Sequence, residues 1–217
     1  MSEDTRARRS YDGTRRRERS AETRARIIEA AASAFLERGY TGATIPYIAE
    51  KAGVAVETVY RSASGKAGLL EAAVQAAVAG GVDRAEVPVD SRPALKRVID
   101  EPDPRRKLEA YVRSVTGTWR RAGPLLRVLA AAASTDPALE DLRAGHDGFR
   151  RAGMGRFAHS LAEADALAED VSEEMAGDIL FTLCAQANYD SLVGLLGWSE
   201  DRYRAWLTST LASTLLR

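Results

Sequence analysis

Apolar residues recur at intervals of three and four positions along most of this chain, which is the spacing of one buried face of an α-helix. The first such stripe lies between Ala21 and Gly39. Its members are Ile27, Ile28, Ala31, Ala34 and Phe35. Glycine commonly follows the last residue of a helix, so this one is expected to end at Gly39. Strict alternation of apolar and polar residues is absent, and the pattern predicts an all-α fold.

Three shorter helices are predicted after the first. One begins behind Thr44, whose side chain suits an N-cap, and ends at Gly53. The next covers about residues 56–62, and a fourth covers residues 66–79. We expect these helices to join the first in an N-terminal domain of residues 21–79, whose last helix connects it to the remainder of the chain.

The stretch from Gly80 to Pro88, which is rich in turn-forming and charged residues, is the predicted domain linker. Beyond it the helical spacing returns in several blocks, which indicates a second helical domain of residues 90–217. The blocks cover about residues 92–99, 105–121, 124–133, 137–162, 172–197 and 199–216.

Charge is distributed unevenly between the two parts of the chain. The net charge of the whole is zero, yet residues 1–66 hold 13 Lys and Arg against 9 Asp and Glu. A basic front end suggests contact with a polyanion, although a solvated chance imbalance explains the same numbers. Residues 1–20 contain almost no apolar side chain, so they cannot offset their ordering entropy and are expected to form a flexible basic arm.

Composition narrows the class of protein. Hydrophobic residues make up 45 % of the chain and charged residues 29 %, as in globular proteins. No apolar run approaches the roughly 20 residues of a membrane-spanning helix, and the N-terminus lacks the apolar stretch of a signal peptide. The single cysteine, Cys184, excludes an intrachain disulfide and suits a reducing compartment. We therefore expect a cytoplasmic protein.

The segment from Thr44 to Tyr60 has the pattern of a helix-turn-helix. Gly53 can take the positive φ that a tight turn between two helices requires. Such a pair presents the N-terminal half of its second helix to the DNA major groove. The exposed side chains that could then reach bases or phosphates are Glu57, Thr58, Tyr60 and Arg61, followed by Lys66 at the start of the next helix. Many helix pairs of this kind have no DNA partner, so the pair alone is equally consistent with a helical bundle that binds no DNA.

Here the sequence resembles the TetR family of bacterial repressors over about residues 21–74. The family pattern is met by Gly39-Tyr40, Thr44, Ile48-Ala49, Ala52-Gly53-Val54, Thr58-Val59-Tyr60, Lys66 and Leu69. The resemblance implies phosphate contacts by Thr44, Thr58, Tyr60 and Lys66. It also implies that Val56 and Glu57 lie near base edges.

Three residues complicate the match. The family commonly has Ser or Thr where Ala55 would cap the third helix, and a missing cap costs about 1 kcal/mol. It commonly has an aromatic residue where Ala63 stands, so packing beneath the next helix should be looser. Glu57 could accept a hydrogen bond from cytosine N4 or simply face solvent.

The arginines of the N-terminal arm are a second candidate for DNA contact. Arg15, Arg16 and Arg17 are consecutive, and Arg19 follows them. They could add phosphate or minor-groove contacts, whereas most charged tails only increase solubility. The first interpretation remains a hypothesis at this point.

The resemblance further implies that the second domain binds a small molecule and forms a homodimer. A two-fold dimer would read a palindromic operator, and repression is the common role in the family. A stripe on the last two helical blocks could form the dimer seam, or only the core of the domain. It consists of Leu180, Leu183, Cys184, Ala187, Ser191, Leu195, Trp206, Thr210, Leu211 and Thr214.

A ligand pocket requires apolar walls with a few polar groups. Our candidates are Tyr111, Val115, Trp119, Leu126, Phe149, Met154, Phe181, Gln186 and Tyr189. Each of them could equally be an ordinary core residue, and Trp119 and Phe149 are the strongest candidates. Arg120 and Arg127 could pair with an anionic ligand, or face solvent and acidic neighbours.

Enzymatic and metal-binding functions find little support. The two histidines, His146 and His159, belong to no cluster with ligand spacing, and no phosphate-binding loop or nucleophile motif is present. We therefore predict no catalytic residues, no metal and no cofactor. Cys184 lies in an apolar stretch, which favours an inert core thiol over a redox sensor. An all-α enzyme or a pure interaction bundle remains the alternative to a regulator.

Overall fold

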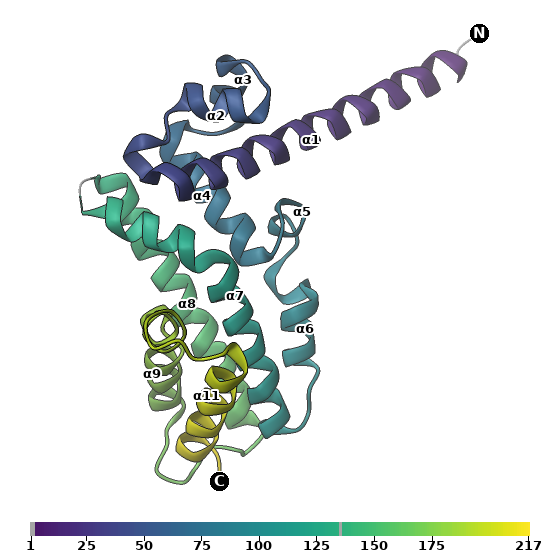
Figure 1. The fold of residues 1–217 in the computed structure, drawn as a ribbon. Coiled ribbons are helices and arrows are strands. Elements are labelled where there is room, and N and C mark those ends of the chain that lie inside the picture. The colour runs from purple at the N-terminus through teal and green to yellow at the C-terminus, as the bar shows by residue number, and fades with distance from the viewer. Residues whose placement is uncertain (1–2, 135) are drawn as a thin grey trace.

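The computed structural model describes residues 3–134 and 136–217, with side chains from Arg17 onward. Figure 1 shows an elongated molecule in which the N-terminal helices form one end and the C-terminal helices the other. Every regular element in the described part is helical, and its single bridge pairs Leu167 with Leu216. The predicted all-α fold, with a helix-turn-helix domain followed by a larger helical domain, is confirmed.

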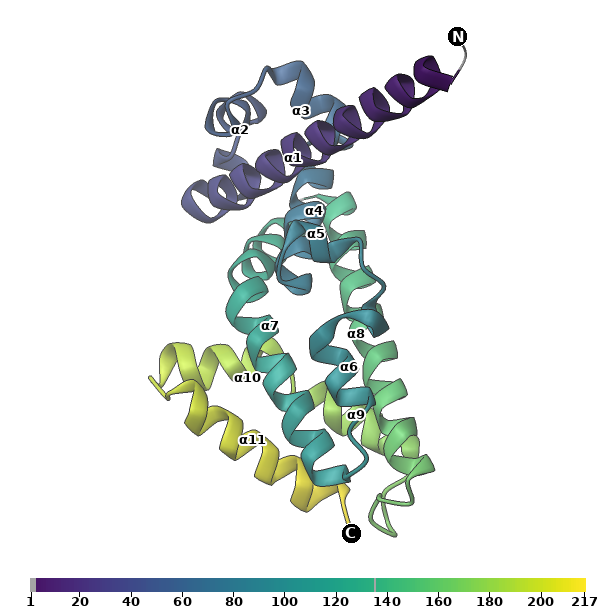
Figure 2. The same ribbon diagram turned by 90° about the vertical axis from the view of Figure 1, so that its right-hand side faces the viewer.

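Helix α1 spans Glu3–Gly42, but Gly39 breaks it. With φ 65° and ψ −179° this residue is not helical, so the first helix turns at the glycine that the sequence indicates. The segment expected to be a flexible arm continues α1 from Glu3 onward, as a rod that extends beyond the other helices (Figure 2). The side chains of Arg15 and Arg16 lie outside the described residues.

Helices α2 (Ile45–Ala52) and α3 (Val56–Ser62) form the predicted helix-turn-helix. The Thr44 hydroxyl accepts a hydrogen bond from the backbone N–H of Tyr47 at 3.3 Å, and thereby caps α2. Gly53 ends this helix with φ 64°, in the left-handed region that glycine tolerates best. Both predicted helix signals are confirmed.

Ala55 occupies the N-cap of α3 in an extended conformation and makes no side-chain cap. Serine at this position could accept a hydrogen bond from a free N–H of the first turn. We expect Ala55→Ser to raise the free energy of unfolding by about 1 kcal/mol, measured by urea denaturation. Ala55→Val, which offers no acceptor, is the control and should give no such gain. Equal stability of the two variants would contradict the cap argument.

Helix α4 (Gly65–Ala79) connects the helix-turn-helix to the rest of the molecule and ends at Gly80. The predicted linker contains a short helix, α5 (Val82–Ala85), and leads into the 3-10 turn η1 (Val89–Ser91). Helix α6 (Pro93–Ile99) follows.

Helix α7 spans Pro104–Ala133 as one element, although Gly123 and Pro124 predict two helices. Proline removes one backbone hydrogen bond, but the apolar stripe continues on both sides of it. Trp119 and Leu126 are both buried, and the Gly123 carbonyl oxygen accepts a hydrogen bond from Gln186 Nε2 at 2.9 Å. Packing therefore holds the helix together where the local sequence favours a break.

The C-terminal region departs from the prediction in the opposite direction. Helix α8 (Pro137–Glu163) is continuous, as expected. The block 172–197, predicted as one helix, is divided into α9 (Glu173–Leu183), α10 (Gln186–Tyr189) and a π-helical stretch, η2 (Asp190–Leu195).

The break follows Cys184, where Ala185 is extended. Asn188 Nδ2 donates to the carbonyl oxygens of Thr182 and Leu183 at 2.9 and 3.0 Å, which satisfies the end of α9. Helix α11 (Glu200–Leu215) completes the fold and packs against α7 and α9.

Two apolar clusters hold the molecule together. The first joins α1–α4 to the upper part of α7 and the start of α8, and includes Phe35, Ile48, Leu70 and Leu129. The second joins α6, α7, α8, α9 and α11. The N-terminal end of the molecule is therefore packed directly onto α7. In the described part of the chain, no helix is long and apolar enough to span a membrane.

Candidate nucleic-acid interface and apolar cavity

Helix α3 presents one face to solvent at the end of the molecule. Its inward residue, Val59, is 1 % exposed and packs in the core with Ile48. On the outer face Glu57 and Arg61 are exposed, and Tyr60 is 60 % exposed. Val56 and Thr58 are half-buried. The Tyr60 ring and hydroxyl are therefore accessible to a partner.

Lys66 and Thr44 lie at the other predicted phosphate positions. Thr44 is exposed, with its hydroxyl engaged in the cap of α2. The Lys66 ammonium donates to the Thr41 carbonyl oxygen at 3.1 Å and lies 4.6 Å from the centre of the Tyr40 ring. Partial burial lowers the pKa of Lys66 from its usual value. This lysine is therefore held against the loop before α2 rather than extended into solvent.

A groove runs between α1 and α3. It is lined by Arg19, Ser20, Thr23, Arg24, Ile27, Thr58, Arg61 and Ser62. Arg61 Nη2 donates to Thr58 Oγ1 at 3.3 Å. Arg17 of α1 is exposed. The structure thus places arginines of α1 beside the outer face of α3.

A polar network that the sequence does not signal braces α1 against α2. Glu37 accepts hydrogen bonds from the Ser33 hydroxyl at 2.8 Å, the Tyr47 hydroxyl at 2.8 Å and the Lys51 ammonium at 2.7 Å. The Arg38 guanidinium lies 3.5 Å from the centre of the Tyr47 ring. The bond from Lys51, followed by those from Ser33 and Tyr47, lowers the pKa of Glu37 from 4.5 to about 2.

This network predicts an acid-dependent loss of stability. Because the folded-state pKa of Glu37 is lowered, its contribution is complete above its unfolded pKa and is lost as the pH falls toward 2. We expect Glu37→Gln to destabilise the protein at pH 7, with a difference from wild type that shrinks between pH 5 and pH 2, measured by urea denaturation. Glu29→Gln changes an exposed carboxylate on the same helix and is the control. A difference that stays constant with pH would contradict the assignment.

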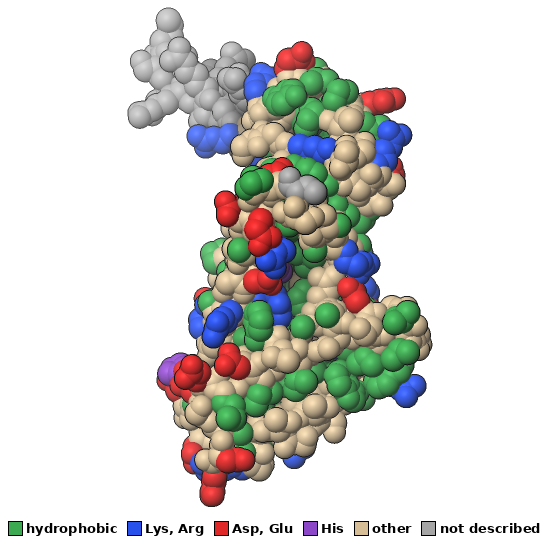
Figure 3. Space-filling model, turned by 90° about the vertical axis from the view of Figure 1, so that its left-hand side faces the viewer, with side chains coloured by type: hydrophobic (Ala, Val, Ile, Leu, Met, Phe, Trp, Pro, Cys, Tyr) green, Lys and Arg blue, Asp and Glu red, His purple; other side chains and the backbone are tan. Residues whose placement is uncertain are grey.

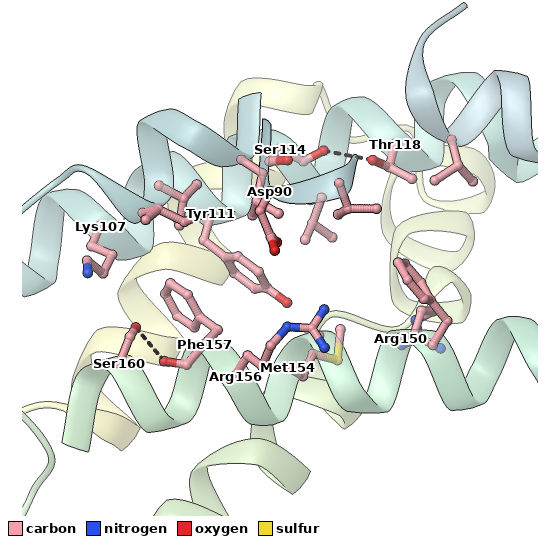
Figure 4. Close-up of a pocket in the computed structure, with 18 of the residues that line it drawn as sticks. Asp90, Lys107, Tyr111, Ser114, Thr118, Arg150, Met154, Arg156, Phe157 and Ser160 are labelled. Carbon is pink, nitrogen blue, oxygen red and sulfur yellow. Dashed lines mark hydrogen bonds between the residues drawn. The ribbon is translucent and has the colours of Figure 1, made fainter. Parts of the chain in front are cut away.

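A cavity of about 410 Å³ lies between α6, α7 and α8, with η1 and the end of α4 at its edge. Its size falls in the range of small-molecule sites, roughly 300–1,000 Å³. Five of the nine predicted pocket residues line it. They are Tyr111, Val115, Trp119, Phe149 and Met154. Figure 4 shows the labelled lining residues approaching the space from both sides.

The other four predicted pocket residues lie elsewhere. Leu126 belongs to the first apolar cluster, which joins α1–α4 to α7. The ring of Phe181 contacts the Arg150 guanidinium, which lies 4.4 Å from the ring centre. Gln186 bonds to Gly123 and Asp190, and the Tyr189 hydroxyl donates to Glu200 Oε1 at 2.9 Å. Gln186 and Tyr189 follow the turn after Cys184, which the local sequence does not signal.

Arg150 is a lining residue that the sequence analysis missed. Its guanidinium lies between the rings of Trp119 and Phe181, at 5.3 and 4.4 Å from their centres. Nη1 pairs with Asp147 at 3.4 Å and Nη2 donates to the Phe181 carbonyl oxygen at 3.2 Å. Arg150 Nε and His146 Nε2, both buried, have no hydrogen-bond partner among the described residues.

Arg120 and Arg127 do not reach this cavity. Arg120 pairs with Glu200 at 3.5 Å, and Arg127 pairs with Asp190 at 2.8 Å. Both arginines are more than half exposed. Of the two interpretations in the sequence analysis, the structure favours acidic neighbours over an anionic ligand.

Three residues of the predicted dimer seam are wrong. Leu180, Cys184 and Leu211 are fully buried in the core of their own chain, so they cannot contact a partner. The other seam residues are exposed or half-buried. They are Leu183, Ala187, Ser191, Leu195, Trp206, Thr210 and Thr214. Figure 3 shows a band of apolar side chains across the C-terminal half of the molecule.

The pKa values of Cys184 and His159 are shifted by their surroundings. Burial raises the pKa of the Cys184 thiol to about 12, which agrees with an inert core thiol. His159 lies between Glu163 and Glu173, at 3.5 and 3.1 Å, and the bond to Glu173 raises its pKa. Within the described residues no three His, Cys, Asp or Glu side chains gather as a metal site would require.

Comparison with known proteins identifies the N-terminal domain. Residues 27–73 match the family model described as bacterial regulatory proteins, tetR family. No curated protein matches the chain by sequence. NalD of Pseudomonas aeruginosa, the secondary repressor of a multidrug efflux pump, has a similar structure. The TM-score is 0.69 at 20 % identity, over 91 % of this chain and 98 % of NalD.

Two ligand-bound structures are also similar. FadR of Bacillus subtilis in complex with stearoyl-CoA gives a TM-score of 0.68 at 15 % identity, over 87 % of this chain and 97 % of FadR. A transcriptional regulator from Saccharomonospora viridis in complex with choline gives 0.69 at 20 % identity, over 90 % and 98 %. At these identities the likeness establishes a shared fold.

Proposed function

We propose that the protein is a ligand-responsive transcriptional repressor rather than an enzyme, because residues 27–73 match the family model of the tetR family of bacterial regulatory proteins. It binds a palindromic operator as a homodimer. A small molecule in the cavity of the C-terminal domain lowers its affinity for that operator.

The outer face of α3 supports the DNA-binding part. Tyr60, Arg61 and Glu57 extend from a helix whose opposite side is fixed in the core. Such a helix can enter the major groove with its first residues at the base edges. Thr44 and Lys66 lie on the flanking elements α2 and α4, where they would contact phosphates. The arginines of α1 would add charge along the backbone.

The exposed face of α9 and α11 supports the homodimer. A groove between these helices is lined by Met175, Ile179, Thr182, Thr210 and Thr214, among others. Met175 is 49 % exposed, and Leu195 on the neighbouring π-helical stretch is 82 % exposed. A two-fold interface on this face would carry two α3 helices into successive major grooves and give the operator its symmetry.

The position of helix α4, between the helix-turn-helix and the cavity, is the observation that supports the ligand response. Its N-terminal end holds Lys66 beside the loop that precedes α2, and its C-terminal end supplies Val78 to the cavity wall. Arg121 of α7 donates to the carbonyl oxygens of Ala77 and Val78 at 3.3 and 3.5 Å. A ligand that favours one position of α4 would therefore favour one position of α2 and α3. The two positions would differ in their affinity for DNA, and the ligand would shift the protein toward one of them.

Selection of bound duplexes from a random DNA pool tests this function. We expect enrichment of a two-fold symmetric sequence whose half-site centres lie about one helical turn apart or somewhat more, roughly 34–36 Å or above. Two chains should bind each duplex in analytical ultracentrifugation. Failure to enrich any sequence at low salt would overturn the proposal, and enrichment of an asymmetric site by a monomer would overturn its dimeric part.

A further inference from the structure

The walls of the cavity are mostly apolar, so most of any ligand there must be apolar as well. Leu95 and Val98 of α6 face Val115 and Trp119 of α7, with Met154 and Phe157 of α8 completing the lining. Burying such surface against an apolar ligand contributes about 25 cal/mol for each Å². The chemistry of the ligand's polar end must therefore be read from the few charged and polar groups present.

Those charged groups are predominantly cationic. Lys107, Arg150 and Arg156 line the cavity, and Asp90 is the one carboxylate among its lining residues. Within the described residues neither Lys107 nor Arg156 has an ion-pair partner. Figure 4 shows the Arg156 guanidinium extending from α8 into the space between the two walls. Arg156 is exposed and Lys107 is half-buried, so both lie at the edge of the cavity. A guanidinium without a protein partner beside an apolar space is available to an anionic ligand group.

Tyr111 supplies a hydrogen-bond donor at the same place. Its side chain is 8 % exposed and stacks on Phe157, with ring centres 4.1 Å apart. Its hydroxyl bonds to no described residue and points into the cavity from the α7 side (Figure 4). Burial raises the pKa of Tyr111 well above its usual value, so the phenol keeps its proton and can donate. A hydroxyl that faces the cavity without a protein partner is available to donate to an acceptor on a ligand.

The aromatic rings of this cavity are poorly arranged for a cation. A cationic ligand needs a free aromatic face or a carboxylate partner. The Arg150 guanidinium already lies 5.3 Å from the centre of the Trp119 ring, and Tyr111 and Phe157 cover one face of each other. A second cation would also be repelled by Arg150 and Arg156. Asp90 is the one carboxylate in the lining that a cation could use, against Lys107, Arg150 and Arg156, so the balance of charge favours an anion over a quaternary ammonium compound.

We propose that the effector is an amphipathic monocarboxylate, with its apolar body against the walls of α6, α7 and α8 and its carboxylate bound by Arg156 and the Tyr111 hydroxyl. This inference rests on the proposed function and names the ligand class of the same cavity. It assigns Arg156 the role of binding the charge and Tyr111 that of fixing its orientation.

Three probes with one chain length and different head groups test the proposal. Decanoate, decanol and decyltrimethylammonium are titrated into the full-length protein below their micelle-forming concentrations, by isothermal titration calorimetry. A hydrogen bond to a charged group contributes about 1.5–3 kcal/mol, which corresponds to roughly a 10- to 100-fold difference in affinity. We expect decanoate to bind at least tenfold more tightly than either of the other probes.

Variants then locate the head group. Arg156→Gln should weaken decanoate by about tenfold or more and leave decanol unchanged. Tyr111→Phe retains the stacked ring and should weaken decanoate more than decanol, because an ionised carboxylate is a stronger acceptor than a hydroxyl. Arg151→Gln is the matched control, because Arg151 is exposed on the same helix and does not line the cavity. The affinity of Arg151→Gln for each of the three probes should equal that of wild type.

Several results would overturn the inference. These are equal affinities for the three probes, a preference for decyltrimethylammonium, or decanoate binding that Arg156→Gln leaves intact. The DNA selected above is titrated with the same preparation. If the protein binds that DNA but does not prefer decanoate over the other two probes, only the proposed ligand class is wrong. If it binds no DNA, the proposed function itself is wrong.

Discussion

Replacing Tyr60 with alanine is expected to weaken binding to duplex DNA by about 10- to 100-fold and to leave the free energy of unfolding almost unchanged. Tyr60 is 60 % exposed on the outer face of α3, so its truncation removes little packing within the chain. A hydrogen bond from its hydroxyl to a phosphate, which is charged, contributes about 1.5–3 kcal/mol. Fluorescence anisotropy with a labelled duplex and urea denaturation measure the two quantities.

Leu36→Ala is the control for this prediction. Leu36 is 51 % exposed in the same domain, but it lines a groove with Pro124 and Val128 of α7 rather than the surface of α3. Its truncation should leave DNA affinity at the wild-type value. If Tyr60→Ala bound DNA as tightly as wild type, or if Leu36→Ala weakened binding to the same extent, α3 would not be the reading surface.

The second large effect concerns the C-terminal core. Leu211→Ala is expected to lower the free energy of unfolding by about 2–5 kcal/mol, because Leu211 is fully buried within its own chain. Leu195→Ala makes the same chemical change at a side chain that is 82 % exposed. If Leu195 contacts the partner, its truncation should raise the dimer dissociation constant and alter unfolding mainly through that equilibrium.

Urea denaturation at two protein concentrations separates these effects. The loss in Leu211→Ala should be the same at both concentrations. The loss in Leu195→Ala should be confined to concentrations at which the wild type is dimeric. A concentration-dependent loss in Leu211→Ala alone would place this residue in the subunit interface and contradict its burial in the chain.

The N-terminal domain was the most predictable part because its signals are local. Thr44 caps α2 through its own side chain, and Gly53 takes the positive φ that is expected of a glycine between two helices. The inward spacing of Ile27, Ala31 and Phe35 follows from the helical period alone. Each of these features depends on residues within a few positions of one another.

The errors arose where tertiary contacts override local preference. Pro124 indicates a helix end, yet α7 continues because its buried stripe extends across it. Nothing comparable in the local sequence marks the break after Cys184, which depends on Asn188 bonding to the end of α9. An apolar stripe also fails to reveal which neighbour covers it. Leu180 and Leu211 were therefore assigned to a subunit interface when they face their own core.

Candidate site residues show the same division. The aromatic residues Tyr111, Trp119 and Phe149 were assigned to a pocket by size and polarity, and they do line one. Arg150 and Arg156 went unnoticed because charged residues on a helix are usually solvated. Their position beside an apolar cavity depends on how α8 packs against α7, which no single helix encodes.

Helix α3 is proposed to read a specific DNA sequence. The most direct test compares the affinity of the wild-type protein for the selected duplex and for a shuffled duplex of the same composition, at physiological salt. Specific complexes are typically at least about 10³-fold tighter than non-specific ones. We predict a difference of that order, which Tyr60→Ala reduces. Equal affinity for the two duplexes would contradict the account.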